Sequence, residues 1–460
     1  MEAYTERFQS FRIGKYEKKE QTIVENLREL ISSTALCEEY RKSPKNFTRR
    51  RVLTFSYLVV LMLSGHKMSL QNSLNKFFKS IGQIFKVPTG SAYCQSRQKI
   101  KAEVFVHLNN SVRDDFYRLY EAEEQVEKWC GHRLLGSDGT YLKLPDTKEL
   151  RKVFSVHRTS YKGEEFASVQ ALGMVLYDLL NDIGVKGAIG PSHSSEKSLL
   201  FNQLWSELKE GDVLVLDRNS ADYKIIGQAV RDNFDVIIRC PSQSFKAVRD
   251  FFQSSDKERI VTLTVPQSAL TQKYVKENNL PEAIEVRLLK FKLESGEDEV
   301  LLTTLCDQKK YRSKEFYKVY GWRWRDETYY DRIKNIFELE RFSGLSEESI
   351  KQDFYGVIFL ATLESVLSRE TEREMQAMAA ERETKTMPQI NHAISYVALV
   401  GEVGKLLSDP TVSVKETLRE LKHLFQTNPT RVRKGRKYVR KKTSPTTKLR
   451  YHRYNKRVLA

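Results

Sequence analysis

Two short apolar runs, each ending in an acidic residue, constrain the fold of this chain most strongly. Residues 133–138 read Arg-Leu-Leu-Gly-Ser-Asp, and residues 212–217 read Asp-Val-Leu-Val-Leu-Asp. Apolar residues at successive positions are typical of strands that are buried on both faces of a sheet. Further strands are expected at 168–180 and 235–239, alternating with amphipathic helices at 194–208 and 220–232. The alternation predicts an α/β sheet.

The segments around this sheet have a different pattern. Residues 241–310 contain strand-like stretches, whereas helical spacing dominates the first 125 residues and the region after 311. At 460 residues, two to four domains are expected. We predict these regions: a helical domain at 1–125, an α/β core in two parts at 126–240 and 311–370, a β-strand-rich insertion at 241–310, a helical C-terminal region at 371–426, and a flexible basic tail at 427–460.

Positive charge is concentrated in this tail. The chain has a net charge of +17, and 13 lysines and arginines lie within 431–460, where no acid occurs. Tyr438, Tyr451 and Tyr454 alternate with these cations. Such a segment is typical of an arm that contacts nucleic acid phosphates. The alternative is a tail that only increases solubility.

Cysteine usage and hydropathy indicate a cytoplasmic protein. The five cysteines lie far apart without a Cys-x-x-Cys pair, which argues against a zinc ribbon or a disulfide framework. The longest apolar run, 52–65, is shorter than the roughly 20 residues of a membrane span. The N-terminus is charged from Glu2 onward, so we expect no signal peptide and no membrane partner.

Residues 320–334 are predicted to form one helix, because no glycine or proline interrupts them after Gly321. At about 100° per residue, one narrow arc of this helix carries a phenol, a carboxylate and two cations. These residues are Tyr320, Arg323, Glu327 and Lys334. The opposite face, which we expect to be buried, carries Trp322, Tyr329, Ile333 and Ile336. The polar arc suits a metal ion beside a phosphodiester, or is an ordinary solvated face.

Three acids are candidates for a metal site. Asp138 and Asp217 each end a predicted strand, and neighbouring strands bring such side chains together. Glu327 would complete a site for two Mg²⁺ ions, because Mg²⁺ prefers carboxylate and water ligands. An Asp after a strand is also an ordinary turn former or helix cap. Asp331 competes with Glu327, and Asp146 and Asp222 are weaker rivals.

These stretches together resemble the insertion-sequence-four family of DDE transposases. The spacing Tyr320, Arg323, Glu327 and Lys334 is the family's Tyr-Arg-Glu-Lys signature, and Trp324 follows the arginine as it commonly does there. Asp138-Gly139-Thr140 and Asp217-Arg218 resemble its two other acidic motifs. Asn219-Ser220 departs from the family's usual Gly-aromatic continuation. The long gap between Asp217 and Glu327 matches the family's β-strand insertion.

The resemblance implies an RNase H-like core and a cut-and-paste transposase that acts as a homodimer on double-stranded DNA. Asp138, Asp217 and Glu327 would be the catalytic metal ligands for two Mg²⁺ ions, for which Mn²⁺ substitutes. Tyr320, Arg323 and Lys334 would bind DNA phosphates near the scissile bond. The protein would be cytoplasmic and associated with the nucleoid. Further candidates for DNA contacts are Trp324, Arg218, Arg97, Lys99 and Lys101.

The N-terminal candidates lie in a basic stretch at 93–101, which either reads DNA as part of a helix-turn-helix-like domain or forms the solvated face of a bundle. The resemblance favours the first alternative. Some family members stack a flipped base on a tryptophan of the insertion, but this insertion contains none; Phe245, Phe251 or Phe252 would have to serve. Two rival functions remain: a nuclease of the same fold that does not join ends, and a DNA-binding protein without catalysis.

Overall fold

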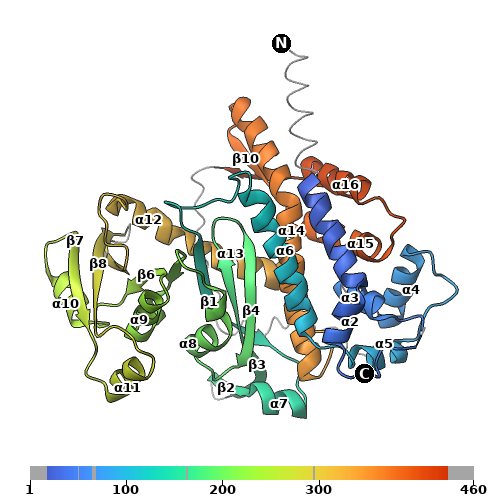
Figure 1. The fold of residues 1–460 in the computed structure, drawn as a ribbon, viewed down its shortest axis with the longest axis horizontal. Helices are drawn as coiled ribbons and strands as arrows, with labels where there is room; N and C mark the ends of the chain where they lie inside the picture. Colours follow the sequence, from blue (N-terminus) through green and yellow to red (C-terminus); the bar gives the residue numbers. More distant parts are fainter. Residues whose placement is uncertain (1–17, 50, 65–68, 162–163, 294–295, 434–460) are drawn as a thin grey trace. The chain divides into compact units, whose positions relative to one another are not determined.

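The computed structural model describes residues 18–49, 51–64, 69–161, 164–293 and 296–433 (Figure 1). The chain separates into two units. The sheet unit comprises residues 126–141 and 172–330. The helical unit comprises residues 1–125, 142–171 and 331–460. Of the predicted basic tail, residues Thr430–Arg433 form a short strand, and the residues from 434 onward lie outside the described part of the chain.

The sheet unit contains a large mixed sheet. Its strands are β1 (Leu134–Lys143), β3 (Glu164–Asp178), β4 (Ile183–Pro191), β5 (Val213–Leu216), β6 (Asp235–Cys240), β7 (Glu258–Thr264), β8 (Ala283–Lys292) and β9 (Asp298–Thr303), with the first residues of β3 and the last of β1 belonging to the helical unit. The order is β2-β3-β1-β5-β6-β9-β8-β7, where β2 (Val156–Tyr161) pairs with the first residues of β3, and β4 pairs with β3 off this path. Strands β1, β5 and β6 are parallel, whereas β9, β8 and β7 are added antiparallel. The strands of the predicted insertion therefore extend the same sheet.

The apolar runs form the core of this unit. All four residues of β5 are buried, and Leu214 and Leu216 pack in one cluster with Val236 and Ile238 of β6. Helix α9 (Tyr223–Arg231) contributes Ile225 and Ile226 to the same cluster. The other helices of the sheet unit are α8 (Glu196–Leu199), which continues as irregular turns to Glu207, α10 (Lys246–Gln253), α11 (Ala269–Glu277), α12 (Ser313–Trp322) and α13 (Trp324–Asp331), whose last residue is the first of the helical unit.

The helical unit is organised around α14 (Glu347–Glu381), whose residues are mostly buried along its first two thirds. This helix packs against α6 (Glu103–Glu121), α3 (Phe55–Leu63), α15 (His392–Ser408) and α16 (Val414–Thr427). The remaining elements are a helix at 18–32, α2 (Thr34–Tyr40), α4 (Leu70–Ser80), α5 (Gly90–Arg97), α7 (Lys148–Phe154), β2 (Val156–Tyr161) and the ribbon of β10 (Thr386–Gln389) with β11 (Thr430–Arg433). No described helix is both long and apolar enough to span a bilayer.

The stretch 320–334 is not the uniform helix that the sequence predicts. Helix α12 ends at Trp322, and α13 begins at Trp324. After α13 the chain widens into a π-helical turn at Arg332–Ile336. A wheel with a fixed 100° step therefore loses register at Arg323, where the first helix ends, and again in the π turn, which has more residues per turn than an α-helix. Arg323, predicted on the polar face, is buried, and Trp322, predicted on the buried face, is half-buried.

Candidate functional site

Asp138 and Asp217 leave neighbouring parallel strands at the same level. In the register of β1 with β5, Leu134 lies opposite Val213 and Gly136 opposite Val215. Two residues further, this register places Asp138 level with Asp217. Residues at one level of parallel strands point to the same face, and the strands lie about 4.8 Å apart. The two carboxyl groups therefore share one corner of the sheet, as the sequence analysis predicts.

Arg323 connects Asp138 to Glu327. Its guanidinium lies 3.6 Å from Asp138 Oδ2 and donates a hydrogen bond of 3.2 Å to Glu327 Oε1. Glu327 is on α13, one turn after Arg323, and its side chain is about one third exposed at 35%. One buried cation thus bridges two acids from distant parts of the sequence. Since like charges repel, such a bridge stabilises their proximity.

The pKa values in this corner follow from burial and crowding. Burial raises the pKa of Asp138, while a hydrogen bond of 2.8 Å from the Gly139 N–H to Asp138 Oδ1 acts in the opposite direction. The neighbouring Asp217 raises it further. Asp217 also caps the short turn that follows β5, because its Oδ1 accepts from the Asn219 N–H at 3.0 Å. Asp217 therefore does act as a cap, as the alternative interpretation expects. Capping uses only part of the hydrogen-bonding capacity of its carboxylate, so further acceptor positions are left for a metal ion.

Glu196 is a fourth acid of this corner that the sequence analysis does not select. It lies in the first turn of α8, behind the N-cap Ser195. A Cβ atom at position 139 would lie 2.2 Å from Glu196 Oε1, so only glycine admits this carboxylate beside Asp138. Burial, and then Asp138 and Asp217, raise the pKa of Glu196 to about 6. An acid in the first helical turn is so common that the sequence offers no signal for this role.

Replacing Glu196 by glutamine is expected to stabilise the metal-free protein above pH 6. The folded protein keeps the Glu196 proton up to a pKa of about 6, against 4.5 for an ordinary glutamate. Stability is therefore lost as the pH rises through this window, by at most about 2 kcal/mol. Glu196→Gln removes this loss. Thermal unfolding in EDTA between pH 4 and 8 measures it, and parallel curves for the two proteins would contradict the assignment.

Asp326, next to Glu327, is only 1% exposed. Neither of its carboxyl oxygens has a hydrogen-bond partner among the described residues. Its Oδ2 lies 2.3 Å from where a Cβ of Gly136 would be, so it packs directly on β1. Burial raises the pKa of Asp326 well above that of an ordinary aspartate. Its helical spacing from Tyr329 and Tyr330, both buried in the same helix, could have indicated an inward position.

The donor groups of this corner decide which metal it could hold. Among the described residues, no three His, Cys, Asp or Glu side chains are placed closely enough to hold an ion. The donor chemistry nevertheless fits Mg²⁺, because Asp138, Asp217 and Glu327 supply only carboxylate oxygens. The strand register places Asp138 level with Asp217, and Arg323 contacts both Asp138 and Glu327. A cation is already present between two of them in the form of Arg323.

The other residues of the signature differ in exposure. Tyr320 is buried with its ring 5.7 Å from the Arg323 guanidinium, and burial raises its pKa. Trp324 is 49% exposed beside the same guanidinium, at 5.1 Å. Arg218 is exposed on the turn after Asp217. Lys334 belongs to the helical unit, in the π turn, where burial lowers its pKa and Glu340 counteracts this.

The N-terminal candidates are not alike. Arg97 is buried, and its guanidinium binds Gln352, Ser343, Asp353 and the Ser349 carbonyl within the helical unit. This network leaves Arg97 inaccessible to DNA, so we remove it from the proposed contacts. Lys99 is half-buried, and Lys101 is exposed with its Nζ 2.8 Å from the Glu39 carbonyl.

The rival acids have local roles. Asp331 is exposed and accepts a hydrogen bond from Asn335. Asp146 forms an exposed ion pair with Arg151. Asp222 caps α9 and pairs with Lys197 at 2.8 Å. Each of the three acids thus has a partner of its own close to it in the sequence or the fold.

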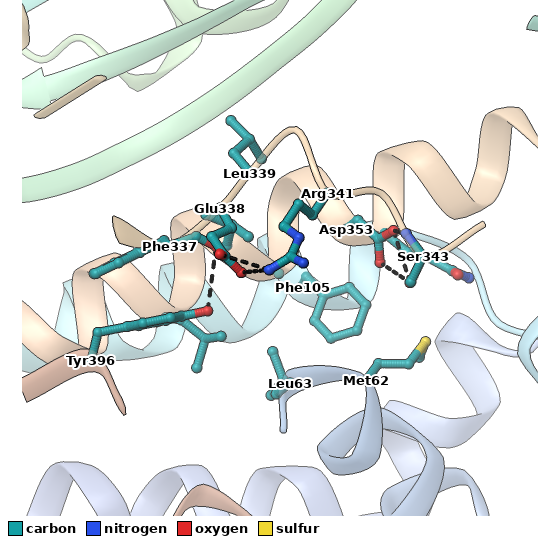
Figure 2. A pocket seen from close by; sticks show the side chains of 14 residues that line it. Met62, Leu63, Phe105, Phe337, Glu338, Leu339, Arg341, Ser343, Asp353 and Tyr396 are labelled. Atoms are coloured by element: carbon teal, nitrogen blue, oxygen red, sulfur yellow. Dashed lines mark hydrogen bonds and ion pairs between the residues drawn. The ribbon is translucent and has the colours of Figure 1, made fainter. Parts of the chain in front are cut away.

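The helical unit also contains a small cavity of about 80 Å³, lined in part by Phe105, Tyr396 and Arg341 (Figure 2). Its charged groups are already paired. Arg341 binds both oxygens of Glu338 at 2.7 Å, and Asp353 accepts from the hydroxyl and the N–H of Ser343. Volume and pairing together leave little for a ligand to bind, so the cavity is a weaker candidate than the acidic corner.

No protein-family model matches this chain. Over 276 residues, or 59% of its length, the chain is 23% identical to the transposase InsG of insertion sequence element IS4 from Escherichia coli strain K12. The match covers 60% of InsG, so the chain spans less than two thirds of that relative. Among solved structures, the piggyBac transposase synaptic complex with hairpin DNA overlaps with a TM-score of 0.39 and 11% identity, covering 87% of this chain and 85% of that one. This TM-score supports no assignment.

Proposed function

We propose that this chain is a DNA transposase of the insertion-sequence-four type. It would cut DNA at the inverted repeats of a transposable element and join the freed 3′ ends to target DNA. One observation carries the proposal: the fold brings Asp138 and Asp217 level on neighbouring strands, and Arg323 links Asp138 to Glu327. Three separate motifs of the resemblance thus meet in one place. The similarity to InsG, a transposase by name, supports the same class.

The order β4-β3-β1-β5-β6, with β1, β5 and β6 parallel, supports an RNase H-like core. In that core Asp138, Asp217 and Glu327 would hold two Mg²⁺ ions. Bound Mg²⁺ would activate the attacking oxygen and stabilise the leaving oxygen. Mn²⁺ would substitute. A homodimer on DNA, association with the nucleoid and DNA contacts by the basic tail complete the proposal.

The protein side chains would orient the DNA backbone. Arg323 pairs with two carboxylates in the structure, so binding of metal would free its guanidinium to donate to phosphate oxygens. Tyr320 and Lys334 are assigned to phosphate by the resemblance. Trp324 and Arg218, both exposed, are available for further contacts, as is Lys101. Lys99 remains a candidate.

Linear DNA that carries the inverted repeats flanking the gene tests this function. Wild-type protein with Mg²⁺ is expected to cut at the repeat ends and to join them to a target plasmid. With Ca²⁺, which supports assembly without chemistry in such sites, it is expected to bind the ends only. Cutting without joining would indicate a nuclease of the same fold. Binding without cutting in Mg²⁺ or Mn²⁺ would indicate a DNA-binding protein without catalysis.

A further inference from the structure

The hydroxyl group of Tyr330 connects helix α13 to two strands of the sheet. It donates a hydrogen bond of 2.6 Å to the carbonyl oxygen of Asp138 in β1. It also accepts a hydrogen bond of 2.8 Å from the N–H of Val175 in β3. The side chain is buried, at 8% exposure.

These contacts join the helix of one candidate ligand to the backbone of another. Tyr330 lies three residues after Glu327 in α13, so both side chains belong to one rigid helical turn. Asp138 contributes its carbonyl to Tyr330 and its carboxyl group to the acidic corner. Movement of α13 along β1 would break the hydrogen bond and would change the separation between Glu327 and Asp138.

A second contact holds the same pair of elements. Asp326, one turn before Tyr330, packs on Gly136, where a Cβ atom would lie 2.3 Å from its Oδ2. Position 136 is two residues before Asp138 in β1, and position 326 is four before Tyr330 in α13. Helix α13 and strand β1 therefore contact each other at two points. Among the described residues, Tyr330 makes hydrogen bonds at its point, whereas the Asp326 carboxyl group makes none.

We propose that Tyr330 is a positioning residue of the metal site, whose hydroxyl sets the separation of Glu327 and Asp138 by fixing α13 to the peptide group of Asp138. This inference rests on the proposed function, because it assumes that these acids bind Mg²⁺ together. Groups that orient metal ligands without touching the ion commonly change metal affinity by about 10- to 100-fold. Tyr330 would act in this way, because it contacts the Asp138 peptide group and not the ion.

The test is Mn²⁺ binding to the full-length protein without DNA, followed by electron paramagnetic resonance. Tyr330→Phe keeps the ring and removes the hydroxyl, and we expect it to weaken Mn²⁺ binding by about 10- to 100-fold. Excess Mn²⁺ should then restore DNA cleavage to near the wild-type rate. Tyr329→Phe is the matched control: Tyr329 is buried in the same helix, but its ring contacts that of Tyr177 in a tilted arrangement, at 4.5 Å between ring centroids. It should bind Mn²⁺ as the wild type does.

A merely structural role for Tyr330 would give a different result: lower thermal stability with unchanged Mn²⁺ affinity, which would overturn the inference. Should Tyr330→Phe not fold, Gly136→Ala displaces α13 at the other contact and is expected to weaken Mn²⁺ binding as well; unchanged affinity in that variant would also count against the inference. If the wild type itself bound no Mn²⁺, the proposed metal site would fail and the inference with it. If the wild type bound Mn²⁺ and Tyr330→Phe and Gly136→Ala bound it with the same affinity, the inference about Tyr330 would be refuted while the proposed metal site would stand.

Discussion

Glu327→Gln is expected to abolish DNA cleavage, with a rate at least about a thousandfold below that of the wild type. Loss of one carboxylate ligand removes several kcal/mol of transition-state stabilisation from a metal site, and about 4 kcal/mol corresponds to this factor. A glutamine can still accept the hydrogen bond from Arg323 that Glu327 accepts at 3.2 Å. Folding and DNA binding in Ca²⁺ should therefore be retained. Gel assays with labelled repeat ends measure both steps.

Asp331→Asn is the matched control, because it removes a carboxylate one turn later in the same helix. Asp331 is exposed and contacts Asn335. We expect its variant to cleave at close to the wild-type rate. The opposite outcome, with Asp331→Asn inactive and Glu327→Gln active, would show that the third metal ligand has been assigned to the wrong turn.

Arg97→Ala is expected to destabilise the helical unit by about 3 to 5 kcal/mol. The substitution leaves Asp353, Gln352 and Ser343 without the buried guanidinium that they bind at 2.7 Å. Breaking a buried ion pair by removing one partner costs about this much, because the remaining charge stays desolvated. Three of the four hydrogen bonds of Arg97 also join α5 to the first turns of α14, and the fourth reaches Ser343 in the segment before that helix.

The tryptophans allow this loss to be assigned to one unit. All four, at 129, 205, 322 and 324, belong to the sheet unit. During urea unfolding, tryptophan fluorescence therefore reports the sheet unit, while circular dichroism at 222 nm also reports the helical one. Arg97→Ala should shift only the dichroism transition to lower urea. Lys101→Ala, at an exposed position of the same basic stretch, should shift neither. Wild-type stability combined with weakened DNA binding would mean that Arg97 contacts DNA after all.

The burial of Arg97 also illustrates what a local sequence pattern does not contain. Gln95, Arg97 and Lys99 alternate in a basic stretch that is typical of a DNA-reading helix. Nothing in that stretch distinguishes Arg97 from Lys99, because the partners of Arg97 lie about 250 residues later, at Ser343, Gln352 and Asp353. Burial of a cation is decided by distant residues, which a local pattern does not contain.

The sequence by itself determined the α/β sheet and the strand-like character of residues 241–310, because the period of apolar residues directly reflects which faces are buried. It also predicts Asp138, Asp217 and Glu327 as one set, through the resemblance of three motifs to a transposase family. Only the tertiary structure decided which side chains surround that set. The carboxylate of Glu196 against Gly139, the buried Asp326 and the hydroxyl of Tyr330 on the Asp138 carbonyl all depend on close packing between segments far apart in the chain. Such contacts are set by distances of a few ångströms in space, and no regularity along the chain records them.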